Sequence, residues 1–245
     1  MTALLAQMRA DLRTLDDPRR YFHATYLRTT QAVADEIDRG GFADNAWVSR
    51  WDLAFATLYT DALEAVRRGD AVSGPWRIAF DAAREAPDLP PLRHVLLGLN
   101  AHINYDLPQA LLAVITPADV DDPVVWRARQ DDHRHVDVVL QAQVGAEEQE
   151  LNAMSTVTLI DHLLRPANRM ASRRFLAEAR RKVWHNAGVL DQARRVSPAQ
   201  YAATLAVLED LCTARVRELT MPGPILLNLA RKGGFGVVLP GGRLA

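Results

Sequence analysis

The sequence predicts an all-α protein: a bundle of about seven to nine helices forming a single domain over residues 1–245. Three observations favour this fold class. Apolar residues recur at helical spacing along most of the chain, no stretch shows the alternation of a β-strand, and helix-start and helix-stop residues flank the periodic stretches. The tail, residues 221–245, is rich in Gly and Pro and is expected to be irregular.

Helices are expected where a start signal precedes a periodic stretch and a stop signal follows it. Asp17-Pro18 and Asp44 are such start signals, since one offers a cap with a first-turn proline and the other a cap alone. Gly69 is a stop signal, and Pro108 is expected to kink or restart the helix in which it lies. The helices expected in the first half cover residues 18–38, 44–68, 74–85 and 92–107.

The same start and stop signals predict further helices in the second half of the sequence. Asp121-Asp122-Pro123 and Ser197-Pro198 are start signals for two of them. Gly145 and the acidic residues 147–150 are expected to form the solvated end of the first. The expected spans are residues 123–144, a short amphipathic piece at 155–164, and long helices at 167–194 and 198–219.

Composition excludes several classes of function. The net charge of -1 gives no electrostatic basis for binding nucleic acid. No uninterrupted apolar run approaches the ~18 residues of a membrane span, and residues 1–15 lack the apolar core of a signal peptide. Cys212 is the single cysteine, so no intrachain disulfide can form, and its helical surroundings favour a buried apolar role. A cytoplasmic protein is expected; the oligomeric state is not specified.

One polar cluster interrupts an apolar helix between Leu97 and Pro108. His102 and Asp106 are four residues apart, so on a helix they project from one face. An imidazole and a carboxylate in that arrangement can bind one divalent metal or form a hydrogen-bonded acid–base pair. Asn100 and Tyr105 lie close by in the sequence and are candidates for orienting a substrate.

A second polar cluster covers residues 131–137. The apolar positions that follow it share a face with Asp132 and His133, so these two are expected to point inward and His135 outward. Helical bundles assemble metal sites from His and carboxylate side chains on different helices. We therefore expect His102, Asp106, Asp132 and His133 to bind a divalent ion such as Zn, Fe or Mn, with Asp52 as a further catalytic candidate.

Purely structural interpretations of these residues stay open. His102 and Asp106 are equally well explained as a structural hydrogen-bonded pair between helices, and residues 131–137 as a solvated charged face. The tryptophans are expected in the core, where several would line an apolar pocket near the polar site. No nucleophile elbow and no H-E-x-x-H sequence is present.

The segment Leu96–Leu111, with its core Asn-Ala-His-Ile-Asn-Tyr-Asp-Leu-Pro, resembles the signature of the bacterial family DUF5995. The regions Trp47–Tyr59 and around Trp184 resemble it too, which implies that Asn100, His102 and Asp106 form a site without implying a reaction. The His-x-x-x-Asp spacing is also similar, more loosely, to the metal-ligand pair of the all-α zinc-dependent phospholipase C and P1 nuclease group.

The leading hypothesis is a metal-dependent hydrolase acting on a small apolar or lipid-like ester or phosphoester. The metal would polarise the substrate and lower the pKa of a bound water. Two alternatives stay open: a metal- or acid–base-assisted cyclase or lyase of a biosynthetic pathway, and a non-enzymatic protein that binds a small apolar ligand.

Overall fold

The computed structural model describes residues 1–151, 166–221 and 234–241, and for residues 141–151 and 166–177 it describes the backbone only. The predicted all-α fold is confirmed, since these residues form helices and contain no strand. The helices are α1 (Thr2–Thr14), α2 (Arg19–Asp38), α3 (Asn45–Arg68), α4 (Gly74–Glu85), α5 (Pro91–Ala101), the π-helix η1 (His102–Asp106), α6 (Leu107–Val114), α7 (Pro117–Asp121), α8 (Pro123–Leu151), α10 (Pro166–Val196) and α11 (Pro198–Thr220).

Most predicted helices lie within one or two residues of their expected bounds. The Asp44 side chain accepts a hydrogen bond from the Trp47 backbone N–H, and Gly69 ends the same helix in the left-handed conformation at φ +78°. The prediction of a helix end at Gly145 is wrong, because α8 continues to Leu151; a single glycine costs a helix only about 1 kcal/mol. The piece expected at 155–164 lies outside the described residues.

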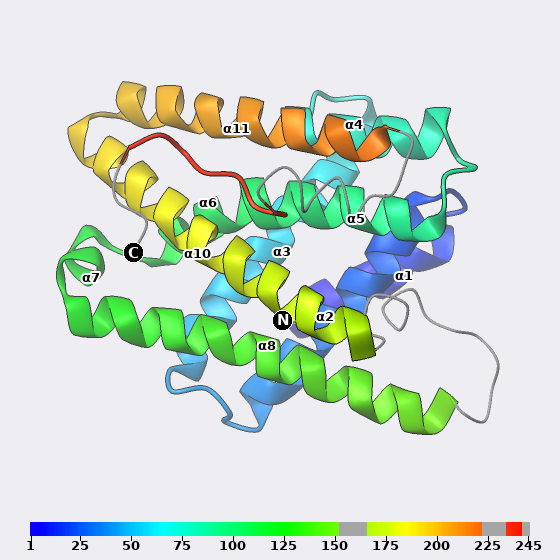
Figure 1. The fold of residues 1–245 in the computed structure, drawn as a ribbon, viewed down its shortest axis with the longest axis horizontal. Coiled ribbons are helices and arrows are strands. Elements are labelled where there is room, and N and C mark those ends of the chain that lie inside the picture. Colours follow the sequence, from blue (N-terminus) through cyan, green and yellow to red (C-terminus); the bar gives the residue numbers. More distant parts are fainter. Residues whose placement is uncertain (152–165, 222–233, 242–245) are drawn as a thin grey trace.

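The centre of the molecule is a continuous rod made of α5, η1 and α6 (Figure 1). Helix α5 packs against α2, α4 and α11, whereas α6 packs against α3 and α10. The rod is thus covered along its length, and Leu97, Ala101 and Leu111 on it are fully buried. Polar side chains on this rod must therefore find partners inside the protein, or each would cost a few kcal/mol.

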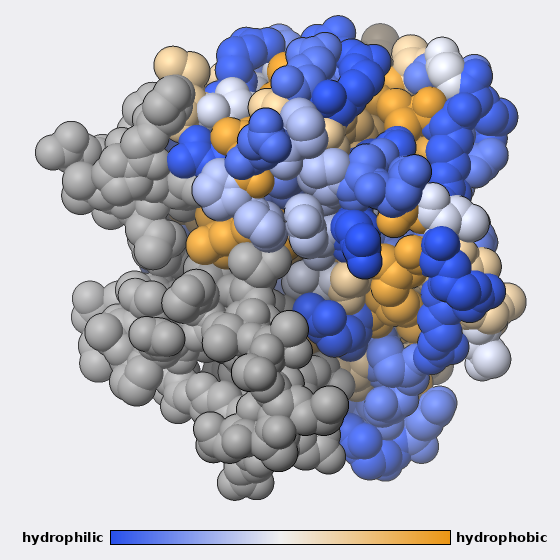
Figure 2. Space-filling view, turned by 90° about the vertical axis from the view of Figure 1, so that its right-hand side faces the viewer, coloured by the Kyte–Doolittle hydropathy of each residue, from blue (hydrophilic) through white to orange (hydrophobic). Residues whose placement is uncertain are grey.

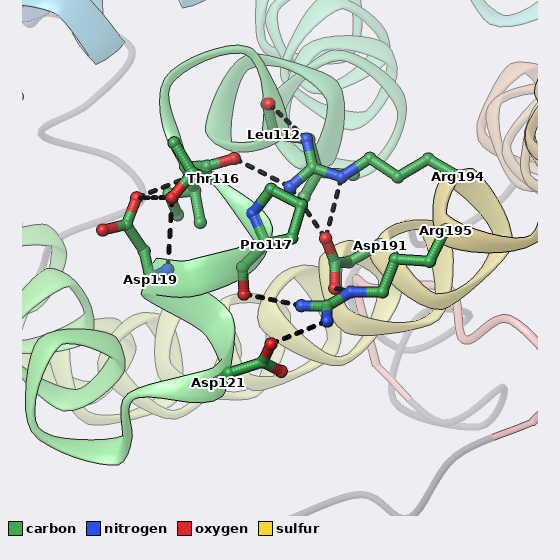
Figure 3. Close-up of polar contacts among 9 residues, drawn as sticks. Leu112, Thr116, Pro117, Asp119, Asp121, Asp191, Arg194 and Arg195 are labelled. Atoms are coloured by element: carbon green, nitrogen blue, oxygen red, sulfur yellow. Dashed lines mark hydrogen bonds and ion pairs between the residues drawn. The ribbon is translucent and has the colours of Figure 1, made fainter.

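A buried ionic junction fixes the end of the rod against α10 (Figure 3). The Asp191 carboxylate is 1% exposed and accepts hydrogen bonds from both Arg194 and Arg195. Arg194 also donates to the backbone carbonyls of Leu112 and Ile115, which have no helical partner at the end of α6. This junction aligns α6, and with it η1, relative to α10.

A hydrophobic core connects the helices with residues 235–239 of the tail. It includes Trp47, Trp51, Trp76 and Trp184, as expected for the tryptophans, and Cys212 is buried and free. The described surface in Figure 2 is mainly hydrophilic, with hydrophobic residues in small patches between charged ones. Among the described helices, none is long and apolar enough to cross a membrane.

Candidate functional site

The polar cluster of the rod lies on a π-helical turn, η1. The Leu107 N–H donates to the carbonyl of His102, five residues earlier, where an α-helix would use the residue four earlier. Pro108 has no N–H, and its ring would clash with the carbonyl of Asn104 in a regular α-helix. The wider turn accommodates the proline, so the restart predicted at Pro108 is confirmed. Single π-turns inside helices occur frequently at functional sites.

His102 and Asp106 form a hydrogen-bonded pair inside the protein. His102 Nδ1 lies 2.8 Å from Asp106 Oδ2, and the same oxygen accepts a 2.8 Å hydrogen bond from Trp76 Nε1. Both side chains are buried, at 1% and 2% exposure. An ionised carboxylate accepts hydrogen bonds only, so it selects the imidazole tautomer that carries its proton on Nδ1. The other ring nitrogen, Nε2, then presents a lone pair.

Five aromatic side chains surround the His102 ring, and we name them the aromatic cage. Phe55 stacks on the imidazole with its centroid 3.7 Å away, and Tyr26 meets it edge-on at 4.5 Å. Three more rings lie about 6 Å away, so the imidazole has apolar surroundings on several sides. The cage consists of Phe22, Tyr26, Phe55, Tyr59 and Trp76.

Burial sets the charge state of the pair. It lowers the pKa of His102 below the usual 6.5, against the hydrogen bond and charge of Asp106, which favour protonation. Burial also raises the pKa of Asp106, while the hydrogen bonds from His102 and Trp76 act in the opposite direction. The imidazole is therefore neutral at neutral pH. Its buried Nε2 has no hydrogen-bond partner in the described part of the chain.

Two further polar atoms near the cage are buried without partners among the described residues. The first is the Tyr26 hydroxyl, whose pKa burial raises well above 10; the nearby Thr30 hydroxyl donates to the Tyr26 backbone carbonyl. The second is Oδ2 of Asp52, one helical turn before Phe55 on α3; burial raises the pKa of that carboxyl to about 7. With His102 Nε2, three buried polar groups in and near the aromatic cage lack a hydrogen-bond partner among the described residues, which is unusual for a protein core.

Asp132 and His133 point inward, as the sequence predicts, but they have other partners. The Asp132 carboxylate accepts hydrogen bonds from the backbone N–H groups of Ala43 and Asp44, at 2.8 and 3.0 Å, and so fixes the loop before α3. His133 Nδ1 accepts a 2.9 Å hydrogen bond from Trp184 Nε1. Among the described residues no three His, Cys, Asp or Glu side chains are grouped so that they could hold a metal ion.

Asn100 and Tyr105 lie on other sides of the rod from His102. The Asn100 side-chain amide donates to the backbone carbonyl of Phe235 at 3.1 Å, and Asn104 donates to the same carbonyl at 3.1 Å. The Tyr105 hydroxyl lies 3.3 Å from the carboxylate of Glu209 on α11. The structure therefore brings His102 and Asp106 together with Trp76 and Tyr26, and directs Asn100 toward the tail.

Most residues of the aromatic cage are not among the site residues expected from the sequence. Phe22 with Tyr26 on α2, and Phe55 with Tyr59 on α3, are both pairs four residues apart, which places each pair on one helix face. That spacing was a usable signal for an aromatic surface facing the rod. Asn104 shares the Phe235 carbonyl with Asn100 and lies four residues after it, so the same spacing places these two amides on one face of the rod.

Comparison with known proteins gives a family and no activity. The model of DUF5995, a family of unknown function, matches residues 1–222, which include the whole rod and the aromatic cage. Comparisons with curated proteins and with solved structures found no match. The matched region covers well over half of the sequence, so the chain belongs to the family DUF5995.

Proposed function

We propose that the protein is a hydrolase of small apolar esters in which His102 acts as the general base. The observation that carries this proposal is the state of the imidazole: Nδ1 is bonded to Asp106, and Nε2 is buried without a partner. A carboxylate that orients a neutral histidine in this way prepares the second nitrogen to take a proton from a water molecule. Trp76, bonded to Asp106 as well, holds the pair in place.

The surrounding groups fit the remaining needs of such a reaction. The Tyr26 hydroxyl stays protonated because burial raises its pKa, so it can donate a hydrogen bond to the oxyanion that forms at the ester carbonyl. Asp52 has a pKa of about 7 and can supply a proton to the departing alkoxide. The aromatic cage favours an apolar acyl or alcohol group over a charged one. We place the enzyme in the cytoplasm on the strength of its single, free cysteine.

A metal-dependent version of the same hydrolase is the second candidate. A histidine whose Nδ1–H is bonded to a carboxylate is also the usual arrangement of a metal-ligating imidazole. In this version His102 Nε2 would bind the ion, Asp106 would orient the ring, and the ion would supply Lewis-acid activation of water or substrate. Asp132 and His133, the other ligands expected from the sequence, are occupied by Ala43, Asp44 and Trp184.

The test is hydrolysis of p-nitrophenyl esters with acyl chains from acetate to decanoate. His102→Gln is expected to lower kcat by about a hundredfold or more, the usual contribution of a general base. His135→Gln, a histidine paired with Glu36 at the surface of the bundle, is the matched control and should leave kcat unchanged. Because the reaction needs a neutral His102 imidazole and a protonated Asp52 carboxyl, kcat should rise with pH through a pKa below 6.5 and fall again through a pKa of about 7.

Elemental analysis of protein purified without a histidine tag separates the two versions. A stoichiometric metal that is lost in His102→Gln would replace the general-base proposal by the metal-dependent one. Turnover that persists without metal supports the general base. If the folded wild-type protein hydrolyses none of the esters, and His102→Gln lowers only its stability, the hydrolase proposal is wrong and ligand binding or a structural pair is left.

A further inference from the structure

Residues 234–240, which we name the tail segment, start at the rod and run in an elongated course along α10 (Figure 1, red). Phe235, Val237 and Leu239 are buried at 8%, 6% and 1% exposure, whereas Val238 between them is only half-buried. Alternate apolar side chains therefore enter the protein, as in an extended peptide lying in a groove. The walls of this groove are α5 with η1 on one side and α10 on the other.

The groove recognises the backbone of the tail segment through side chains. Asn186 on α10 donates to the Val237 carbonyl at 3.1 Å and accepts from the Leu239 N–H at 2.8 Å. An amide side chain that pairs with an N–H and a carbonyl in this way replaces a neighbouring β-strand. Asn100 and Asn104 both donate to the Phe235 carbonyl. Such contacts impose an extended backbone and depend little on which side chains the peptide carries.

Further contacts at the Phe235–Gly236 step come from α10. Lys182 donates to the Gly236 carbonyl at 3.1 Å, and the N–H groups of Phe235 and Gly236 lie 3.2 and 3.4 Å from the Glu178 carboxylate. A Cβ on Gly236 would lie 3.3 Å from the backbone Cα of Ala179 and 2.7 Å from the side chain of Lys182. The groove therefore favours glycine at this position of the peptide, because a side chain there would displace Lys182 and press against the α10 backbone.

The groove and its occupant differ in their relation to the family. The family model matches residues 1–222, which supply the walls, including Asn100, Asn104 and Asn186. The tail segment lies beyond the matched residues. Asn100 and Asn104 both donate a hydrogen bond to the tail segment. The residues matched by the family model therefore form a site that is filled by a segment outside the match.

We infer that this groove is a binding site for an extended apolar peptide, and that the tail segment is its intramolecular ligand. The peptide it accepts has an apolar residue, glycine, a second apolar residue, a tolerant position and a third apolar residue. This inference is independent of the proposed hydrolase activity, because it concerns the face of the rod opposite His102.

The test uses the full-length chain and a fluorescent peptide, Gly-Phe-Gly-Val-Val-Leu-Pro-Gly, which copies residues 234–241. Gly236→Val in the protein should expel the tail segment, because the new side chain meets the α10 backbone. This variant is expected to bind the peptide one to one and at least tenfold more tightly than the wild type, whose groove is filled. Pro240→Ala, at an exposed position of the same segment, is the matched protein control and should behave as the wild type.

Two further reagents make the result decisive. A peptide carrying valine in place of its second glycine should not bind, and Asn186→Ala added to the Gly236→Val chain should weaken binding of the original peptide. A second displacing variant, Phe235→Asp with Leu239→Asp, alters only the tail segment. Peptide binding by either displaced chain supports the inference.

The opposite results would overturn it. If hydrogen exchange shows the tail amides released in a folded variant that still binds no peptide, the groove is not a separate binding site. If both displaced chains unfold, as followed by circular dichroism, the tail segment is an integral part of the core and the inference is wrong as well.

Discussion

The two faces of the central rod carry the same spacing and different chemistry. His102 and Asp106, four residues apart, bond to each other and are surrounded by aromatic rings. Asn100 and Asn104, also four residues apart, do not bond to each other and instead share one backbone carbonyl of the tail. A base and an acid satisfy one another, whereas two amides direct their N–H groups to a third group. Residue type, rather than spacing, decides whether such a pair closes on itself or binds something else.

The two faces also leave different atoms unsatisfied. On one face it is a ring nitrogen, His102 Nε2, and on the other the side-chain oxygens of Asn100 and Asn104, all buried without partners in the described residues. A neutral imidazole nitrogen can accept a proton, and an amide oxygen cannot do so near neutral pH. This difference supports the proposed proton chemistry on the rod face that carries His102 and the inferred backbone recognition on the face that carries Asn100 and Asn104. The following changes test this division.

The largest effect is expected from the buried carboxyl group of Asp52, which lies near the aromatic cage. Asp52 has a pKa of about 7 in the folded protein against its usual 3.8, so between these values the native state holds a proton that the unfolded chain releases. The free energy of unfolding should fall as pH rises through this window, by about 4 kcal/mol from this group. Asp52→Asn should remove that dependence, measured by urea unfolding from pH 4 to 8.

The control for this prediction is Asp131→Asn, which changes an exposed carboxylate on α8 and should leave the pH dependence as in the wild type. An Asp52→Asn protein that still loses stability over the same pH range would show that the buried charge lies elsewhere. Asp106 would then be the group to examine, since burial raises its pKa too.

A smaller effect is expected from crowding the aromatic cage. A Cβ on Gly98, one turn before His102, would lie 2.4 Å from the ring of Phe22. Gly98→Ala should destabilise the protein by about 1–3 kcal/mol through overpacking, and lower ester hydrolysis by displacing a ring of the cage. Gly188→Ala on α10 meets no atom within 4 Å, so it should stabilise the protein by up to about 1 kcal/mol. Equal thermal stability of the two variants would contradict the predicted packing.

The smallest effect concerns Asn100 and Asn104: the stability costs of replacing each one should not add up to the cost of replacing both. Asn100→Ala or Asn104→Ala alone should cost about 1 kcal/mol, because the Phe235 carbonyl keeps one donor. The double variant should cost more than the sum, since that carbonyl is then buried without a partner. Urea unfolding measures the loss of stability in the single and double variants, and hydrogen exchange of the tail amides measures how far the tail segment is released. Strictly additive costs would mean that the two amides act independently.

Most of the fold was predictable because its helices carry local signals. Asp44 and Ser197 cap their helices as their sequence positions indicate. Helix α1 was missed, because Met1 at its start makes no side-chain cap and gives no start signal. Helix α7 was missed although Thr116 and Asp119 form a capping box, since only five residues follow the cap.

The site was predictable only where it is local. The bond between His102 and Asp106 follows from their spacing on one helix. The partners of Asn104 and Asp132 do not, because one bonds to a residue 131 positions later and the other to loop residues nearly 90 positions earlier. Such pairings depend on how helices dock, which periodicity does not encode. The four metal ligands expected from the sequence lie on two helices, η1 and α8, which would have to bring these side chains together. In the structure, Asp132 bonds to the loop before α3.

The position of Lys182 under the tail segment has a consequence for chemical labelling. The chain has 29 basic residues, but Lys182 and Lys232 are its only lysines. A reagent for primary amines therefore meets these two side chains and the N-terminal amine. Because the Lys182 ammonium donates to the Gly236 carbonyl, its acylation is slowed while the segment is docked. The arginine-rich composition thus leaves a natural reporter at the groove, readable by mass spectrometry in unaltered protein.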